Sequence, residues 1–282
     1  MLEEKINSMK EKRLKVDSYD VKDVMSDIVS NIKNNIDTLK KTFNQEYEEE
    51  LDVNMLFNSF DLVDFYTEIY KNDFGLVTNS FSPYGLIGLI VDNEISIYNL
   101  ANILSLIIQS RNSIILELKK SKKSLILLIS MINKVLNEKR IVPIETNKYL
   151  SNMNTYDLLI FIGDKDKFNR LNNTCEKKYY GIGNYELIID TELDKKLIET
   201  AKKKNVLITY KTKDDRFYTN FSRISSNYCV SLMTDSKEEA RVFFRDMKAS
   251  FLLVNIIPTL EKRINIRFED LIYQKSCIVY EE

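Results

Sequence analysis

The chain has 282 residues, enough for one large domain or two small ones, and hydrophobic residues make up 44% of it. Its 41 basic and 42 acidic residues leave a formal charge of −1, so nothing electrostatic favours nucleic acid or an anionic membrane as a partner. Histidine is absent, which excludes an imidazole base and a histidine-ligated metal.

Targeting segments are not evident in the sequence. The start, MLEEKINSMKEKRLK, is charged and lacks the apolar run of a signal peptide. The most apolar stretches, residues 100–108 and 125–132, are too short to cross a bilayer. We therefore expect a cytoplasmic protein.

The first part of the chain has the spacing of amphipathic helices. Apolar residues recur at three- and four-residue steps from Val21 to Phe43, and a second series runs from Leu51 to Tyr70. The polar faces carry both signs of charge, which favours helices packed on their own domain over membrane-surface or partner-binding helices. We expect residues 1–80 to be helices packed on the core.

From residue 81 short apolar runs alternate with helical repeats. Strands are expected at 85–91, 113–118, 141–144, 157–162 and 185–190, and helices at 95–109, 121–137, 165–172 and 191–204. This order predicts an α/β fold with a doubly wound, mostly parallel sheet. We expect residues 81–204 to form a Rossmann-like domain of the nucleotide-binding type, with strands 85–91, 113–118, 157–162 and 185–190 in one sheet.

The remaining residues, 205–282, continue the alternation less clearly. Strands are expected at 206–210, 228–233 and 250–255, with a polar, turn-rich stretch at 211–227. A helix is expected at 236–247, where Ser236 is a good N-cap and Glu239 completes a capping box. Residues 258–282 show no decisive pattern.

Glycines near strand ends are candidates for a nucleotide site, because a phosphate can approach a glycine backbone at a helix N-terminus. Gly85 and Gly88 begin a strand instead of following one, which favours a structural role. Gly163 follows strand 157–162 and precedes a helix, where a phosphate can bind, but a single glycine favours a tight strand–helix turn. Gly181 and Gly183 precede a strand, which favours a turn over a ligand contact.

The three cysteines are Cys175, Cys229 and Cys277. Their odd number and the absence of CxxC spacing indicate a reducing compartment, and neither a disulfide framework nor a zinc site. Of the three, Cys175 comes closest to the setting that a catalytic thiolate needs, because it follows a short helix and lies near Lys177 and Lys178. An inert thiol is still the favoured interpretation.

The order of these pieces resembles the aldehyde dehydrogenase superfamily, and within it the gamma-glutamyl phosphate reductases. The segment PYGLIGLIVDNEISIYNLANILSLIIQSRNSIIL is similar to the nucleotide-binding core of that family, and SLMTDSKEEARVFFRDMKASFLLVN to a segment near its end. The resemblance covers residues 20–260. It implies NAD(P) as cofactor, and residues 205–282 as a shortened remnant of the catalytic and oligomerisation lobe.

By the same resemblance, the cofactor-binding positions are Asn112, Glu117, Lys119, Gly163 and Lys165. Two departures put carboxylates where the family binds a nucleotide phosphate. Glu117 stands in place of an arginine, and Asp164 in place of a glycine. We therefore expect NAD(P) binding to be weak or lost.

A larger departure concerns the nucleophile. In the family, the helix that matches residues 191–204 leads into a loop carrying the catalytic cysteine; here Asn205 alone separates that helix from the next strand. We therefore expect no catalytic residue of this type in the chain.

Three interpretations remain open. The chain is a divergent active reductase that uses Cys175 or another residue, or a non-catalytic protein that binds a nucleotide or a partner, or an assembly subunit without a ligand. The resemblance also implies a homodimer. The first interpretation would make the chain an NAD(P)-dependent aldehyde dehydrogenase or acyl-phosphate reductase, and the other two a pseudoenzyme.

Overall fold

The computed structural model divides the chain into two compact units. Unit 1 comprises Met1–Gly181 and Ile264–Glu282, and unit 2 comprises Ile182–Arg263. The structure describes residues 20–47, 49–63, 68–72, 75–92, 94–136, 140–144, 156–172, 174–181, 184–191, 195–203, 206–224, 227–249, 251–258 and 264–279. Unit 1 therefore passes to unit 2 after Gly181, and the end of the chain returns to unit 1.

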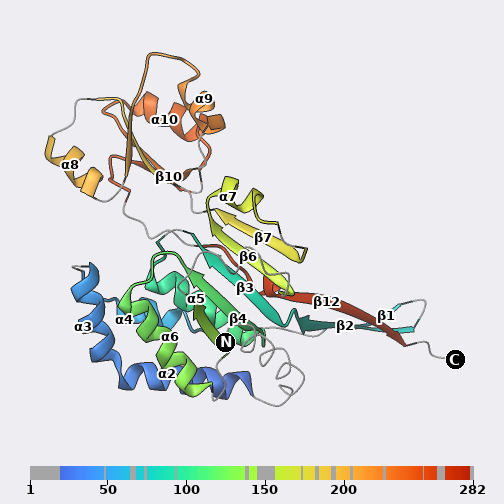
Figure 1. Ribbon diagram of the computed structural model, residues 1–282. Coiled ribbons are helices and arrows are strands. Elements are labelled where there is room, and N and C mark those ends of the chain that lie inside the picture. Colours follow the sequence, from blue (N-terminus) through green and yellow to red (C-terminus); the bar gives the residue numbers. More distant parts are fainter. Residues whose placement is uncertain are drawn as a thin grey trace. The chain divides into compact units, whose positions relative to one another are not determined.

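A five-stranded parallel sheet forms the centre of unit 1 (Figure 1). Its order is β5-β4-β3-β6-β7, with β3 Leu86–Val91, β4 Ser113–Leu118, β5 Ile141–Ile144, β6 Leu158–Gly163 and β7 Glu176–Gly181. Every residue of β3 and β6 is buried, as the continuous apolar runs predict for central parallel strands. The predicted α/β class with a mostly parallel sheet is confirmed.

Helices cover one face of this sheet (Figure 1). They are α5 Ile97–Gln109, α6 Lys123–Val135, α2 Val21–Asn34, α3 Ile36–Tyr47 and α4 Val53–Asn58. Helix α5 is buried along most of its length, because α4 and α6 also pack against it. None of the described helices combines the length and the apolarity needed to cross a bilayer.

Polar side chains attach the N-terminal helices to α6. The carboxylate of Glu46 accepts hydrogen bonds from the backbone N–H groups of Lys123 (2.6 Å) and Ser124 (2.9 Å), and from the Ser124 hydroxyl (2.6 Å). The N-cap residue of α6, Lys122, makes no side-chain capping bond, so Glu46 satisfies these donors from another helix.

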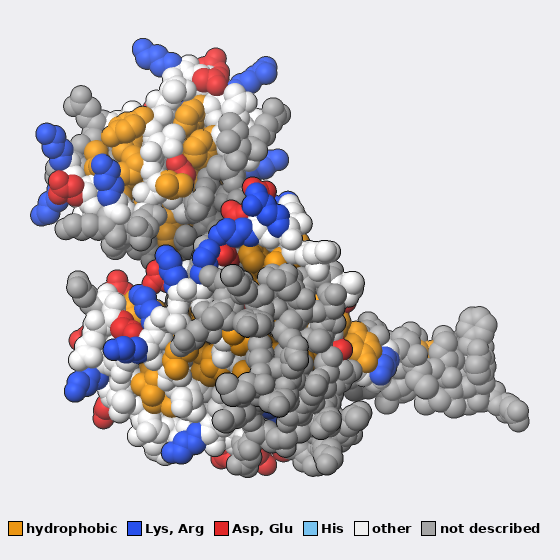
Figure 2. Space-filling view, viewed as in Figure 1, with side chains coloured by type: hydrophobic (Ala, Val, Ile, Leu, Met, Phe, Trp, Pro, Cys, Tyr) orange, Lys and Arg blue, Asp and Glu red, His pale blue; other side chains and the backbone are white. Residues whose placement is uncertain are grey.

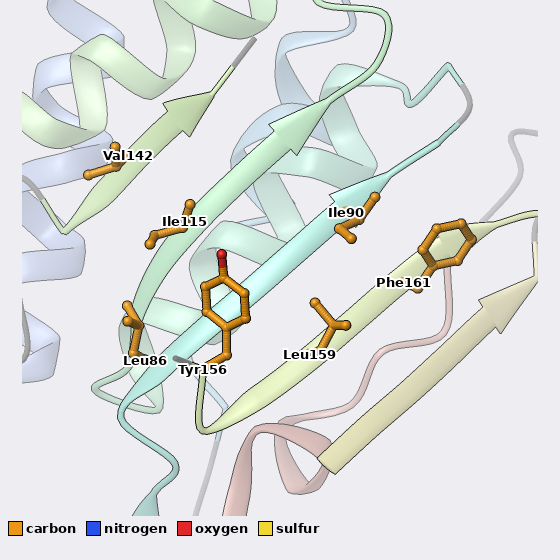
Figure 3. Close-up of a cluster of buried hydrophobic side chains, with 7 residues drawn as sticks. All are labelled: Leu86, Ile90, Ile115, Val142, Tyr156, Leu159 and Phe161. Carbon is orange, nitrogen blue, oxygen red and sulfur yellow. The ribbon is translucent and has the colours of Figure 1, made fainter. Parts of the chain in front are cut away.

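The opposite face of the sheet carries an apolar cluster, shown in Figure 3. Side chains alternate along a strand, so the members from β3 and β6 are an even number of residues apart; β4 and β5 supply one residue each, and Tyr156 precedes β6. Its members are Leu86, Ile90, Ile115, Val142, Tyr156, Leu159 and Phe161. Phe168 of the short helix α7, Lys165–Asn169, packs against them.

Of the helices expected in residues 1–80, the structure contains those between Val21 and Asn58, and residues 1–19 lie outside the described residues. A three-stranded antiparallel sheet follows, in the order β1-β2-β12, with β1 Glu68–Asn72, β2 Gly75–Pro83 and β12 Ile272–Val279. The short helix η2, Phe268–Leu271, leads into β12. The helical spacing of residues 51–70 was misleading. Residues 68–72 pair with the neighbouring strand β2, and β2 in turn pairs with β12, which is distant in sequence.

Unit 2 is a second parallel sheet, in the order β11-β10-β8-β9. Its strands are β8 Asn184–Ile189, β9 Leu207–Tyr210, β10 Asn227–Met233 and β11 Phe251–Val254. Ile188 packs into a cluster with α9 Phe217–Ile224 and α10 Lys237–Asp246, whereas Leu187 and Ile189 pack into a cluster with α8 Lys195–Lys203. Both faces of this sheet are therefore covered.

Unit 2 corrects two predictions. The strand expected at 185–190 lies in this sheet, paired with β10 and β9, and not in the sheet of β3 and β6; β7 takes that place instead. Ser236 is the N-cap of α10 as predicted. The capping box is not formed, because the carboxylate of Glu239 accepts a hydrogen bond from the Tyr218 hydroxyl (2.7 Å) and the N–H of Ser236 donates to Thr234.

Candidate functional site

A cleft lies at the carboxyl ends of the central strands of unit 1. Its volume is about 250 Å³. Ile90, Phe161 and Leu171 form its apolar surface, and Asp92, Glu117, Lys119 and Lys167 line it with charge. In doubly wound sheets, ligands bind outside the carboxyl ends of the strands, so this cleft is the candidate site.

An ion triad dominates the cleft. The Asp92 carboxylate lies directly after β3, and its two oxygens contact the Nζ atoms of Lys119 (Oδ1, 2.8 Å) and Lys167 (Oδ2, 2.6 Å). Burial alone would raise the pKa of Asp92, but the two lysines outweigh it and hold the pKa below its ordinary value. The hydrogen bond to Asp92 raises the pKa of Lys167. Asp92 and Lys167 are therefore charged at neutral pH, and the carboxylate bridges the two amines.

Gly88, Gly163 and Gly181 are each packed by a side chain of the same chain. Gly163 has a φ of +150°, and a Cβ added there would lie 2.8 Å from the Cβ of Asp92. A Cβ on Gly88 would lie 3.0 Å from the ring of Tyr156, one of the cluster residues of Figure 3. Gly88 therefore has the predicted structural role, and Gly163 makes room for Asp92.

Gly181 is also packed by a side chain of the chain. A Cβ on Gly181 would lie 3.1 Å from the hydroxyl of Tyr179, which donates to the backbone oxygen of Gly163 (3.0 Å). Gly183 lies outside the described residues.

The first turn of α7 is capped by the chain itself. The side chain of Asp164 accepts hydrogen bonds from the backbone N–H groups of Asp166 (2.9 Å) and Lys167 (3.1 Å). These are the donors that a phosphate would use at the start of a helix. A carboxylate of the protein already satisfies them.

The structure brings most of the predicted cofactor-binding residues to one place. Glu117 and Lys119 line the cleft, Gly163 lies beside Asp92, and Lys165 is the exposed first residue of α7. Asn112 is not among them. It precedes β4, so the whole strand separates it from Lys119.

Asn112 instead joins parts of the scaffold. It is buried, accepts a hydrogen bond from the N–H of Gly85 (2.8 Å) and donates to the backbone oxygen of Leu271 (2.7 Å) and to the hydroxyl of Ser110 (2.8 Å). These bonds hold the start of β3 and the end of η2 to β4, which is a structural role.

The sequence analysis missed Asp92 and Lys167. Asp92 is the first polar residue after a fully buried strand. A polar residue at that position can be used to predict a ligand site, because ligands bind at the carboxyl ends of parallel strands. Lys167 carries no comparable signal, because α7 is a short polar helix and only its position against β6 directs the amine to Asp92.

The two thiols in the described residues are poor nucleophiles. Cys229 is fully buried in β10 of unit 2, and burial raises the pKa of its thiol. Cys175 precedes β7 and packs against the apolar cluster; burial raises the pKa of its thiol as well. The side chain of Cys277 is outside the described residues. Within the described ranges, no group of acidic residues and cysteines is arranged to hold a metal ion.

Comparison with known proteins finds similarity in structure only. No protein-family model and no curated protein sequence matches the chain. Gamma-glutamyl phosphate reductase from Thermotoga maritima matches with a TM-score of 0.60 and 14% identity, over 99% of this chain and 98% of that one. Glyceraldehyde-3-phosphate dehydrogenase from Methanocaldococcus jannaschii, complexed with NADP, matches with a TM-score of 0.72 and 11% identity, over 99% and 94%.

The chain has the aldehyde dehydrogenase fold. Indole-3-acetaldehyde dehydrogenase is a further example, with a TM-score of 0.70 and 13% identity, over 98% of this chain and 86% of that one. These structural matches confirm the predicted fold class, and the fold they share is the one that the resemblance in the sequence implied. Identities this low show the aldehyde dehydrogenase fold and leave the activity to be argued from the residues.

Proposed function

We propose that the chain is a homologue of the NAD(P)-dependent aldehyde dehydrogenases, resembling gamma-glutamyl phosphate reductase, that does not carry out thiol catalysis. The observation that carries the proposal is the setting of its described thiols. Catalysis of this kind needs a thiolate within bonding reach of a carbonyl held beside the cofactor. Cys229 is buried inside a strand, and Cys175 is packed on an apolar cluster with a raised pKa.

The connection between α8 and β9 supports the same proposal. Helix α8 ends at Lys203 and β9 begins at Leu207, so residues 204–206 alone join them. This is the place at which the resemblance puts the loop with the nucleophilic cysteine. A connection this short leaves no room for such a loop.

The charges of the cleft support weak or absent binding of NAD(P). Asp92 bridges Lys119 and Lys167, Asp164 caps α7, and Glu117 adds a second carboxylate to the lining. The residues present do not fit a dinucleotide, because carboxylates of the chain offset the lysine charge and cap the helix N–H groups that its phosphates need. The protein is then a non-catalytic member of this fold.

The test is a coupled assay that follows NAD(P)H with glutamate-5-semialdehyde, and with a panel of aldehydes, on the wild-type protein and on Cys175→Ser. We expect no turnover with either protein. Cys229→Ala is the matched control, because it removes a thiol that no substrate can reach. Turnover that disappears in Cys175→Ser and persists in Cys229→Ala would contradict the proposal.

An assembly role is the second candidate, and the surface of unit 2 favours it. Hydrophobic side chains gather on the face of this unit that Figure 2 shows. On β9, Leu207 is 51% exposed and Tyr210 is 62% exposed. β9 is an edge strand, and edges of this kind are templates for pairing with another chain.

A second copy of the chain is the partner expected for this edge. Light scattering after size exclusion would then give a dimer for the wild-type protein and a monomer for Tyr210→Lys. Phe244→Lys on α10 is the control, since Phe244 is 52% exposed but lies on a helix and not on the edge strand. A wild-type monomer would contradict this role.

A further inference from the structure

We propose that Asp92 is a built-in anion that stands in the place of a ligand phosphate and sets which ligands the cleft can accept. On this proposal, removing its charge converts the cleft into a binding site for phosphate and pyrophosphate groups. The proposal rests on the proposed function, because both treat this cleft as the place where a ligand of the chain would bind.

The first step is the bonding of Asp92. Its carboxylate is held between two amines that come from different elements, Lys119 after β4 and Lys167 in α7, at 2.8 and 2.6 Å. Its side chain is only 10% exposed. Two cationic donors that converge on one small anion are the arrangement by which proteins bind phosphate oxygens. Here the anion is part of the chain.

The second step is the glycine that faces Asp92. The added Cβ on Gly163 would lie 2.8 Å from the Cβ of Asp92, closer than such atoms approach in proteins. In a nucleotide site, a glycine at this position lets the ligand approach the backbone. In this chain the space that Gly163 leaves is filled by the side chain of Asp92.

The third step is the balance of charge. The charged residues of the lining are Asp92, Glu117, Lys119 and Lys167, two of each sign. Replacing Asp92 by asparagine keeps the shape of the side chain and leaves an excess of one positive charge. Both amines then regain a donor that an incoming anion can use.

The expected ligand class follows from the size and lining of the cleft. A volume of about 250 Å³ suits a compact group and not a whole dinucleotide. Ile90, Phe161 and Leu171 offer apolar contacts beside the lysines. Inorganic pyrophosphate is therefore the simplest probe, and ADP tests whether a base adds affinity.

The experiment is calorimetric titration of pyrophosphate, and then ADP, into the wild-type protein and Asp92→Asn. We expect no measurable binding by the wild type. Charge-assisted hydrogen bonds from two amines should tighten binding by Asp92→Asn about 10- to 100-fold. Added salt should weaken that binding, and Lys167→Met in the Asp92→Asn background should remove most of the gain.

Glu94→Gln is the matched control. Its carboxylate pairs with Lys122 at 2.6 Å and does not line the cleft, so the variant changes the net charge equally. The proposal would be overturned if Glu94→Gln gained as much affinity for pyrophosphate as Asp92→Asn, or if a folded Asp92→Asn gained none. If Asp92→Asn does not fold, Asp92→Ser makes the same charge change.

A measurement on the wild-type protein alone decides the matter if neither variant folds. Amine acetylation mapped by mass spectrometry should modify Lys119 and Lys167 equally with and without pyrophosphate; protection by pyrophosphate would overturn the proposal. None of these readouts uses an aldehyde. Turnover in the coupled assay would therefore contradict the proposed function without deciding the role of Asp92.

Discussion

Replacing Gly163 by alanine tests the packing on which the site depends. The new Cβ would lie 2.8 Å from the Cβ of Asp92 and 3.2 Å from the ring of Phe161. The Cβ of Asp92 is fixed to the backbone, and its carboxylate is held by two lysines, so rotation of that side chain cannot relieve the clash. Gly163 also has a φ of +150°, which side-chain-bearing residues rarely adopt.

Two costs set the expected magnitude. A sparsely populated backbone conformation costs about 1–3 kcal/mol. Forcing a methyl group into filled space typically costs about 1–3 kcal/mol more. We therefore expect Gly163→Ala to lower the free energy of unfolding by about 3 kcal/mol, because partial relaxation reduces the sum. For a unit of this size, the melting temperature falls by about 6–12 °C.

The assay is urea unfolding followed by circular dichroism, with a double-mutant cycle. In the Asp92→Gly background the clash is removed and the backbone strain remains, so Gly163→Ala should cost about 1–2 kcal/mol less. Gly181→Ala is the control, because its Cβ would meet only the movable hydroxyl end of Tyr179, at 3.1 Å. The reasoning is refuted if the cycle shows no coupling, or if Gly181→Ala costs as much as Gly163→Ala.

Three further predictions concern the scaffold and the thiols. Hydrogen bonds from Ser124 and Lys123 outweigh burial and lower the pKa of Glu46, so Glu46→Gln should lose about 1 kcal/mol of stability, a value already reduced for solvent screening. This loss should be present at neutral pH and vanish as the pH falls below about 4, which unfolding at several pH values will show; an unchanged difference at pH 3 would contradict it. Tyr218→Phe removes a 2.7 Å hydrogen bond to Glu239 and should cost about 1 kcal/mol in the same assay, and no measurable loss would contradict that. At pH 8, Cys229 should stay unlabelled by a thiol reagent in the native protein and Cys175 should react more slowly than a free thiol, as peptide mapping can check; labelling at the free-thiol rate would show that burial does not control either group.

The central strands of unit 1 could be predicted from the sequence because their apolar runs leave few other conformations. Residues 86–91 and 158–163 are buried on both faces, so nearly every side chain is apolar and the pattern is continuous. The edge strand β7, with the sequence EKKYYG, carries no such run, since an edge strand faces solvent and its charged side chains stay exposed or half-buried. The sequence therefore did not predict β7, and β8 was assigned to the sheet of unit 1 in its place.

The sequence by itself thus determined the fold class, the order of the buried strands and two of the charged residues of the cleft, because these depend on local apolar periodicity and on what directly follows a strand. Only the tertiary structure decided which strands share a sheet, since pairing of β8 with β10, or of β2 with β12, joins segments that are far apart in the chain. The tertiary structure also decided which charged residues of the cleft form ion pairs with one another. Asp92, Lys119 and Lys167 come from three separate segments, and nothing in their spacing shows that one carboxylate bridges two amines until the ends of β3, β4 and β6 lie side by side.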